Sequence, residues 1–470
     1  MIRVLNYRVC SIVVLLGTIL LLSCVENRPF RLGKINDAEL GKYYHDQKPW
    51  LEKVQVSEDR SYHISFVEFD EKGDFWDRRQ LARTARMIGG SNKPVLLVTY
   101  IHGWHHNAKD RPPGGKNPGD VQTFRCLLSE LAVSDSTKNF QVHGVYLGWR
   151  GRLIEGPLDY LTFLNRKAAA TRVAGTPVTE TIFELIRQAR KDPNSKCVVI
   201  GHSFGALLLE KAMAQAITGN VLALDAQNPV PQQRFNAPAD LILLVNSAAE
   251  SIYAKEMTDM FARIGYRDAD NRNLPLLISI TSKGDTATGG WFPVGTFFPN
   301  LFAHRKYHWG DKYGPSSDET DQHIYLTTTP GHNKLLFTHS VDKTAPPQRV
   351  PSVEAVARMA GRITMGDCAV VEERNPAFEK NIQHAEDDPM VFATSLKSDP
   401  NQFNWWQIHA YQLNKRTPYW IMQVPKAIIP NHTPIFTPEG RAMMAALFRI
   451  ANPIGQPGAR QIRLAPQTTE

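Results

Sequence analysis

The stretch CVVIGHSFGALLLEKAMAQA, residues 197–216, joins an apolar run to a helical pattern through the pentapeptide GHSFG. This pentapeptide matches G-x-S-x-G, the pattern that places a serine on a sharp turn between a strand and a helix. The two glycines let strand and helix approach without a side-chain clash. A five-residue pattern of this kind often occurs by chance. The match is informative here because an apolar strand precedes it and a helical pattern follows it. Ser203 is the candidate nucleophile, and a Gly-rich turn without chemistry is the alternative.

The middle of the chain alternates short apolar runs with helical patterns, as is typical of a mostly parallel sheet covered on both faces. The pattern predicts strands over residues 64–69, 94–101, 142–149, 197–201, 241–247, 275–281 and 419–424. An amphipathic helix is expected from Thr176, which can cap it, with Pro177 in its first turn. The predicted fold class is therefore α/β, with helices flanking the sheet.

A serine hydroxyl is a weak nucleophile until a base removes its proton and a carboxylate orients that base. In this architecture the acid and the histidine follow the serine in that order. Asp285 comes after the strand at 275–281, at the carboxyl end where α/β active sites lie, and a turn-forming aspartate is the alternative. His432 lies in the loop between the last strand and a helix capped by Thr437. The predicted triad is Ser203, Asp285 and His432.

The loop after the strand at 94–101 contains three histidines within five positions, His102, His105 and His106. In serine hydrolases of this kind, the loop supplies one of two backbone N–H groups that bind the developing oxyanion. We expect Phe204 to give one N–H and Trp104 the other, while Gly103 allows close approach of substrate. His102 is interpreted as a brace that hydrogen-bonds within the loop. We predict no metal and no cofactor, because no further ligands occur at zinc-like spacing.

At these residues the chain resembles the α/β-hydrolase superfamily, and within it a bacterial group of unassigned substrate. The shared motifs are HGWHHNA (102–108), VYLGWRG (145–151), LTFLNRKAA (161–169) and GHSFG (201–205). The resemblance runs from Ile64 to Thr288 and resumes over residues 418–436. It implies an eight-stranded hydrolase sheet and the triad named above.

Three further residues are candidates for the border of the pocket or its support: Arg150, Asn165 and His202. Arg150 can bind an anionic group of a substrate, and an ion pair with a carboxylate is the alternative.

The N-terminus predicts export. Arg3 and Arg8 precede an apolar stretch over residues 9–22, which is too short to span a bilayer comfortably. The following LLSC, residues 21–24, resembles a bacterial lipobox, which implies cleavage before Cys24 and lipidation of its thiol. An ordinary signal peptide or an uncleaved anchor is the alternative. The expected location is a membrane-anchored lipoprotein facing the periplasm or the cell exterior, with the outer membrane favoured where there are two membranes.

The domain organisation follows from these motifs and from a composition shift after residue 285, where Pro, Gly and aromatic residues become frequent. We expect a lipoprotein signal peptide at 1–23, an N-terminal linker or extension at 24–60, the first part of the hydrolase core at 61–285, an insertion or cap at 286–418, the end of the core at 419–452 and a loosely ordered tail at 453–470. The aromatic residues of the insertion fit either a pocket lining or the insertion's own core.

The charge and the cysteine content of the chain argue against a nucleic-acid-binding protein and against a zinc-binding or disulfide-rich one. The chain has 54 Lys and Arg against 46 Asp and Glu, a formal net charge of +8, and no long basic run, which argues against nucleic acid as a partner. Besides Cys24, the expected mature chain has Cys126, Cys197 and Cys368. Their spacing fits neither zinc nor a dense disulfide framework. A disulfide between Cys126 and Cys368 stays open.

The leading hypothesis is an exported serine hydrolase that cleaves a carboxylic ester (EC 3.1.1 class) through an acyl-enzyme, acting on a small-molecule or lipid-like substrate. An amidase or an acyltransferase would use the same residues. A membrane-tethered binding or envelope lipoprotein on a hydrolase scaffold is an alternative of another class. A metal-dependent hydrolase centred on His102, His105 and His106 is the third.

Overall fold

The structure is a computed structural model. It describes residues 27–31, 49–110, 119–134, 137–154, 159, 162–225, 234–263, 266–268, 274–297, 306–307, 320–321, 323–345, 390–395, 403–411, 417–452 and 461–464. The predicted signal peptide and Cys24 lie outside these residues. Among the helices described, none combines the length and apolarity needed to cross a bilayer.

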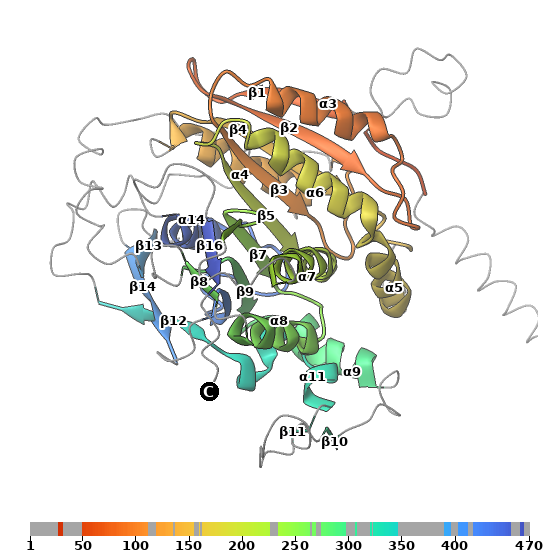
Figure 1. The fold of residues 1–470 in the computed structure, drawn as a ribbon, viewed down its shortest axis with the longest axis vertical. Coiled ribbons are helices and arrows are strands. Elements are labelled where there is room, and N and C mark those ends of the chain that lie inside the picture. Colours follow the sequence, from red (N-terminus) through yellow and green to blue (C-terminus); the bar gives the residue numbers. More distant parts are fainter. Residues whose placement is uncertain are drawn as a thin grey trace, which may run out of the picture.

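An eleven-stranded sheet runs through the centre of the molecule (Figure 1), in the order β1-β2-β4-β3-β5-β7-β9-β15-β12-β14-β13. Its strands are β1 (Leu51–Gln55), β2 (Ser61–Glu68), β3 (Val95–Ile101), β4 (Gln141–Gly148), β5 (Lys196–His202), β7 (Leu241–Val245), β9 (Leu277–Ser282), β12 (His339–Thr344), β13 (Val391–Ser395), β14 (Phe403–Ala410) and β15 (Tyr419–Val424). In this order, the eight strands from β2 to β12 are mutually parallel. The edge strands β1, β14 and β13 each join through an antiparallel pairing, to β2, β12 and β14 respectively.

All the strands expected from the sequence are present, and the predicted α/β class is confirmed: a mostly parallel mixed sheet flanked by helices. The expected count of eight strands is wrong. The missed strands carry weak sequence signals, since β12 is the polar run HSVDKT and has only three buried positions. Its place in the sheet comes from pairing with β15, where His339 lies opposite Met422.

Helices cover both faces of the sheet. The α-helices described are α3 (Arg78–Gly89), α4 (Asp120–Val133), α5 (Phe163–Val173), α6 (Thr176–Ala189), α7 (Phe204–Asp225), α8 (Ser251–Arg263), α9 (Phe292–Phe297), α11 (His323–Thr327) and α14 (Pro438–Ala451). The short α11 packs beside α8, and the short α9 packs beside α11. One apolar core includes residues of α3, α5, α6, α7 and α8, and a second includes residues of α4 and α14. Along β3, Leu97 belongs to the first core and Leu96 and Val98 to the second. Because both faces of the strand are buried, its sequence is continuously apolar.

Shorter elements complete the described structure. They are a π-helical turn (Ala287–Trp291), two 3-10 turns (Pro330–His332 and Lys334–Leu336), a two-stranded sheet of β10 (Lys306–Tyr307) and β11 (Thr320–Asp321), and a three-stranded sheet of β6 (Arg234–Asn236), β16 (Gln461–Leu464) and β8 (Tyr266–Asp268). The helix α6 begins where predicted, but Gly175 is its N-cap, without a side-chain hydrogen bond, and Thr176 is already helical.

Three expected domain boundaries need correction. The described residues of the expected linker or extension, 27–31 and 49–60, are part of the core, because β1 pairs with β2 and the side chain of Arg31 is fully buried. The guanidinium of Arg31 forms ion pairs with Glu52 at 3.0 Å and Asp110 at 2.7 Å. Burying a cation requires such partners, so the ion pairs fix Arg31 against the core.

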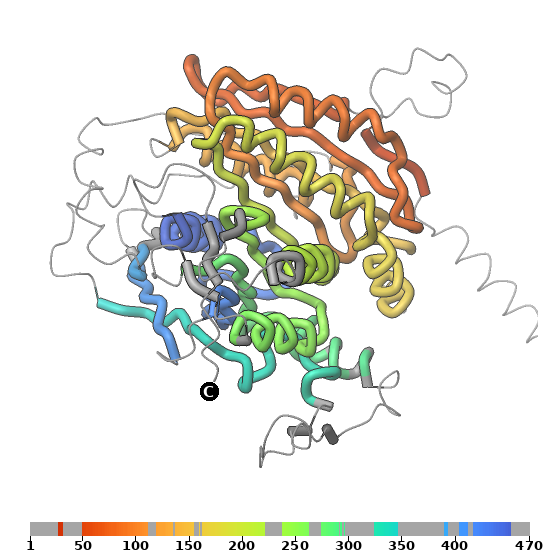
Figure 2. The backbone as a smooth tube through the Cα atoms, viewed as in Figure 1, coloured from red at the N-terminus to blue at the C-terminus, as the bar shows by residue number. Residues whose placement is uncertain are grey.

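The insertion and the tail also differ from expectation. Residues 286–418 contribute β12, β13 and β14 to the central sheet, so this part of the insertion extends the core rather than capping it. Trp405 and Trp406 are buried there, which favours a structural role for these aromatic residues. In the tail, β16 pairs with β6 and β8. Figure 2 shows the blue C-terminal elements beside the green middle of the chain, far from them in sequence.

Candidate active site

Ser203 lies at the turn between β5 and α7, with a backbone φ of 56°. This left-handed conformation is strained for a non-glycine residue and is characteristic of functional turns. A Cβ on Gly205 would lie 2.2 Å from the carbonyl oxygen of Ile101, and one on Gly201 would lie 2.7 Å from the Cα of Ala206. Both glycines are therefore required by close backbone contact, which is the reason for the G-x-S-x-G pattern.

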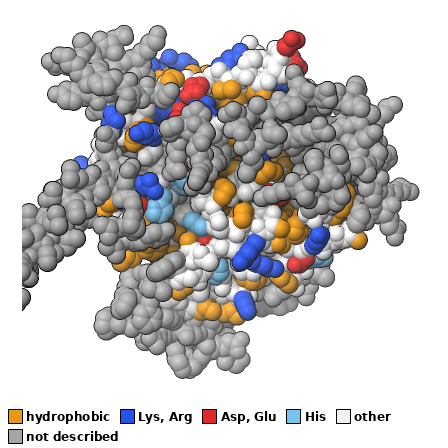
Figure 3. Space-filling model, turned by 180° about the vertical axis from the view of Figure 1, so that it is seen from behind, with side chains coloured by type: hydrophobic (Ala, Val, Ile, Leu, Met, Phe, Trp, Pro, Cys, Tyr) orange, Lys and Arg blue, Asp and Glu red, His pale blue; other side chains and the backbone are white. Residues whose placement is uncertain are grey.

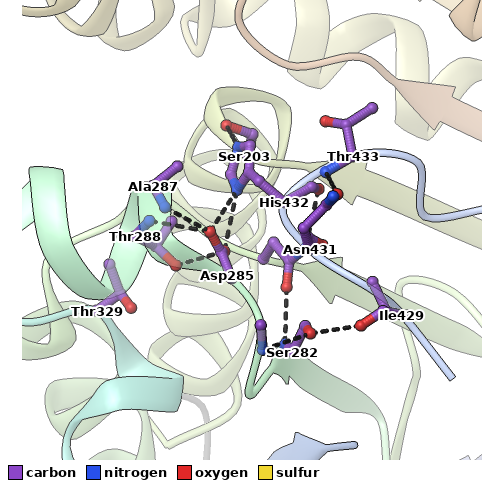
Figure 4. A network of polar contacts seen from close by, with 12 residues as sticks. Ser203, Ser282, Asp285, Ala287, Thr288, Thr329, Ile429, Asn431, His432 and Thr433 are labelled. Carbon is purple, nitrogen blue, oxygen red and sulfur yellow. Dashed lines mark hydrogen bonds and ion pairs between the residues drawn. The ribbon is translucent and has the colours of Figure 1, made fainter. Parts of the chain in front are cut away.

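The structure brings the three predicted triad residues together (Figure 4). The Nε2 atom of His432 lies 2.8 Å from the Oγ of Ser203, and its Nδ1 lies 2.9 Å from each carboxylate oxygen of Asp285. Ser203 follows β5, Asp285 follows β9, and His432 follows β15. Because these strands are parallel, their carboxyl ends meet at one edge of the sheet.

Asp285 is buried, with 3% of its surface exposed, and is surrounded by donors. Its carboxylate accepts hydrogen bonds from the backbone N–H groups of Ala287 and Thr288, both at 3.0 Å, and from the Thr288 hydroxyl. Burial opposes ionisation of this carboxyl, but His432 and the Thr288 donors outweigh it and lower the pKa of Asp285. The carboxylate therefore stays charged and can orient the imidazole.

The loop that carries His432 is fixed through its backbone. The Nε2 of His202 donates to the carbonyl oxygen of His432 at 2.9 Å, and the side-chain amide of Asn246 donates to the same oxygen at 3.0 Å. Asn246 also accepts a hydrogen bond from the backbone N–H of Ser282 at 2.9 Å. It is fully buried, with a φ of 47°. Asn246 was not predicted as a site residue, and its only signal in the sequence is an amide side chain directly after the apolar residues of β7.

The predicted oxyanion loop lies against Ser203. A Cβ on Gly103 would be 2.6 Å from the Cβ of Ser203, so only glycine fits there. Phe204 is the first residue of α7, and the first N–H groups of a helix have no acceptor within it. Trp104 packs against Phe204, with ring centroids 6.0 Å apart. The two predicted donors thus lie on adjacent segments at Ser203, and their binding of an oxyanion remains a prediction.

His102 is buried and uses both ring nitrogens within the protein. Its Nδ1 lies 2.9 Å from the carbonyl oxygen of Gly103, and its Nε2 accepts from the backbone N–H of Trp149 at 3.0 Å. Burial lowers the pKa of His102 to about 4, so the ring is neutral near pH 7. These contacts match the expected brace and leave neither nitrogen for a metal. His105 is also engaged, with its Nδ1 2.6 Å from Asp159.

The other residues expected near the pocket have structural partners. Arg150 donates to Glu71 at 3.0 Å, the ion pair that was the alternative to anion binding, and the buried Arg166 donates to the same carboxylate at 2.8 Å. Asn165 is exposed and accepts a hydrogen bond from Arg166. His202 is 1% exposed and supports the His432 loop instead of bordering an open pocket.

A further histidine, His332, lies close to the acid end of the triad and was also missed. A Cβ on Gly289 would be 2.6 Å from its Nε2. Burial lowers the pKa of His332, with Asp285 opposing that shift. His332 belongs to the long segment between Asp285 and His432, and the fold of that segment places it near Asp285.

The cysteines divide as follows. Cys197 is a free, buried thiol in β5 with a raised pKa caused by burial, as expected of a core residue. Cys126 in α4 is disulfide-bonded. Cys368 lies outside the described residues, so the pairing of Cys126 with Cys368 stays open.

Figure 3 shows the face opposite to that of Figure 1, where histidine side chains lie at the surface near hydrophobic and cationic ones.

Comparison of the chain with family models, with curated proteins and with solved structures found no match.

Proposed function

We propose that this chain is an exported serine hydrolase of the α/β-hydrolase fold that cleaves a carboxylic ester through an acyl-enzyme. The observation that supports the proposal best is the continuous hydrogen-bonded series from Ser203 through His432 to Asp285. The strained serine turn and the parallel order of β3, β5, β7, β9 and β15 add support.

In the proposed reaction, the Oγ of Ser203 attacks the ester carbonyl while the Nε2 of His432 takes its proton. Asp285 stabilises the imidazolium that forms, and the N–H groups of Phe204 and Trp104 stabilise the oxyanion. His432 then gives the proton to the leaving alcohol. Water, activated by the same histidine, attacks the acyl-enzyme and releases the acid with the free serine.

Export and anchoring are part of the proposal and rest on the N-terminal sequence, where Arg3 and Arg8, the apolar stretch and Cys24 occur in the order of a lipoprotein signal. A lipid anchor would place the hydrolase at a membrane surface, near lipid-like esters.

Covalent labelling tests the nucleophile directly. A fluorophosphonate probe should label the purified full chain once, and Ser203→Ala should abolish labelling. Ser57→Ala, which changes a serine in a surface turn, should label as the wild type does. Labelling of Ser203→Ala at the wild-type level would exclude Ser203 as the nucleophile and show that another residue reacts. No labelling of the folded wild type would instead favour a binding protein on this scaffold.

The reaction type needs a substrate panel of p-nitrophenyl esters of graded chain length beside matched amides, with and without an added alcohol. Ester hydrolysis that falls by about 10³-fold or more in Ser203→Ala supports an esterase. Preferential cleavage of the amides, or transfer of the acyl group to the alcohol in place of hydrolysis, would instead assign an amidase or an acyltransferase.

A further inference from the structure

Three potential metal ligands from three different segments of the chain meet beside the serine turn. One donor atom from each of His106, Asp120 and His202 lies within 4.8 Å of the other two. Asp120 and His202 are buried, with exposed fractions of 7% and 1%, and His106 is half-buried. They come from the loop after β3, the start of α4 and the end of β5. Their spacing along the chain matches no metal-binding motif, so the group is visible only in the folded structure.

His202 supplies a buried nitrogen without a partner. Its Nε2 faces the carbonyl oxygen of His432 at 2.9 Å and must carry the proton for that hydrogen bond. The lone pair of the neutral ring is then on Nδ1, and this buried atom has no hydrogen-bond partner. A buried acceptor without a partner has lost its hydrogen bonds to water and gained none in the protein, so such atoms require an explanation. Nδ1 is thus the atom of His202 available as a ligand.

Asp120 is a buried carboxylate without a cationic partner among the described residues. The hydroxyls of Tyr100 and Tyr146 donate to one of its oxygens, at 2.8 and 3.2 Å, and no Lys or Arg of the described chain forms an ion pair with it. Burying a charge without a counter-charge is costly. Carboxylates that bind metals are themselves commonly oriented by such hydrogen bonds. A bound dication would supply the missing charge.

We propose that His106, Asp120 and His202 bind a divalent transition metal of the zinc type, with the fourth position open to water. Two imidazole nitrogens and one carboxylate oxygen form a donor set that suits zinc. Ligands on one tetrahedral zinc lie about 3.3 Å apart, so the loop residue His106 turns inward on binding. The metal would link the loop at 102–106 to α4 and to the residue before Ser203. This site is independent of the proposed hydrolase activity.

Zinc titration of the metal-free full chain tests the site, with bound metal measured by mass spectrometry and folding checked by circular dichroism. The wild type should bind one zinc per chain. His106→Ala and Asp120→Asn should bind about 100-fold more weakly, and zinc should raise the melting temperature of the wild type but not of His106→Ala. The matched control is His105→Ala, a histidine of the same loop that pairs with Asp159 instead, and it should bind as the wild type does.

Cobalt provides a second measurement. The wild type loaded with Co²⁺ should show the visible absorption of a four-coordinate site, and His106→Ala should not. Ser203→Ala should bind both metals normally, which separates this site from the nucleophile. The proposal is overturned if the folded wild type binds no stoichiometric zinc, or if His106→Ala and Asp120→Asn bind it as tightly as His105→Ala. A water molecule would then occupy this position.

Discussion

Gly205 determines how closely the serine turn can approach the neighbouring strand. Its ideal Cβ position lies 2.2 Å from the carbonyl oxygen of Ile101 and 2.5 Å from that of His102, and both are backbone atoms that cannot rotate away. Close contact of this kind requires a backbone shift for any side chain larger than hydrogen. The second glycine of the motif is thus explained by packing alone, before any chemistry is considered.

Gly205→Ala should therefore lower the free energy of unfolding by about 2 kcal/mol, within the range typical of overpacking. Gly219→Ala is the matched control in the same helix, because Gly219 is exposed and its Cβ would meet nothing within 4 Å. It should gain about 0.5–1 kcal/mol, since alanine is the better helix former. Urea unfolding followed by circular dichroism measures both. Equal stability of Gly205→Ala and wild type would refute the packing argument.

The helix α14 fixes the far end of the loop that carries His432. Thr437 is its N-cap: the side-chain oxygen accepts from the backbone N–H of Gly440 at 3.0 Å and the hydroxyl donates to the carbonyl of Ile428 at 2.7 Å. The predicted capping by Thr437 is confirmed, and Pro438 lies in the first turn of the helix. Through its hydrogen bond to Ile428, Thr437 also links the start of α14 to the segment after β15.

Thr437→Ala removes both hydrogen bonds and should lower the free energy of unfolding by about 1 kcal/mol, the usual effect of losing a side-chain cap. Thr437→Ser keeps the hydroxyl and should retain most of the stability. Chemical denaturation of the three proteins at one pH gives the comparison. If Thr437→Ser loses as much stability as Thr437→Ala, the effect does not come from the cap.

At the scale of the whole molecule, Glu210 is a buried carboxyl that connects distant parts of the chain. It lies in α7, and the hydroxyl of Tyr419 in β15 donates to it at 2.6 Å. Burial raises the pKa of Glu210 to about 7. The folded protein therefore keeps this group protonated in a pH range where the unfolded chain has released the proton.

Because the folded pKa lies above the unfolded value, stability from this group is present below the unfolded pKa and is lost as pH rises through about 7. The loss is at most on the order of 3 kcal/mol. Glu210→Gln does not titrate, so its stability relative to wild type should improve between pH 5 and pH 8. Denaturant unfolding at both pH values measures the difference. A difference that does not change with pH would show that Glu210 has an ordinary pKa in the folded protein.

Local patterns in the sequence were sufficient for much of the fold and of the candidate site. Continuous apolar runs predicted the parallel strands because both faces of such strands are buried, as Val98 and Leu97 of β3 illustrate. The glycines around it identified Ser203, and the positions of Asp285 and His432 after strands 275–281 and 419–424 identified the other two residues. The structure brings these three side chains within hydrogen-bonding distance. These features depend on residues close in sequence and on the rule that parallel strands end at one edge.

Only the tertiary structure decided what depends on pairing between distant segments. The polar β12 became a sheet strand because β15 and β14 offered it partners, and Arg31 became buried because Glu52 and Asp110 neutralise it. Likewise, Asn246 contacts the His432 loop, and Asp120 lies near His202. In both cases the spacing of the residues along the chain follows no regular pattern. Hydrogen bonds and charges act over a few ångströms in space, and the sequence alone does not give that distance for residues a hundred positions apart.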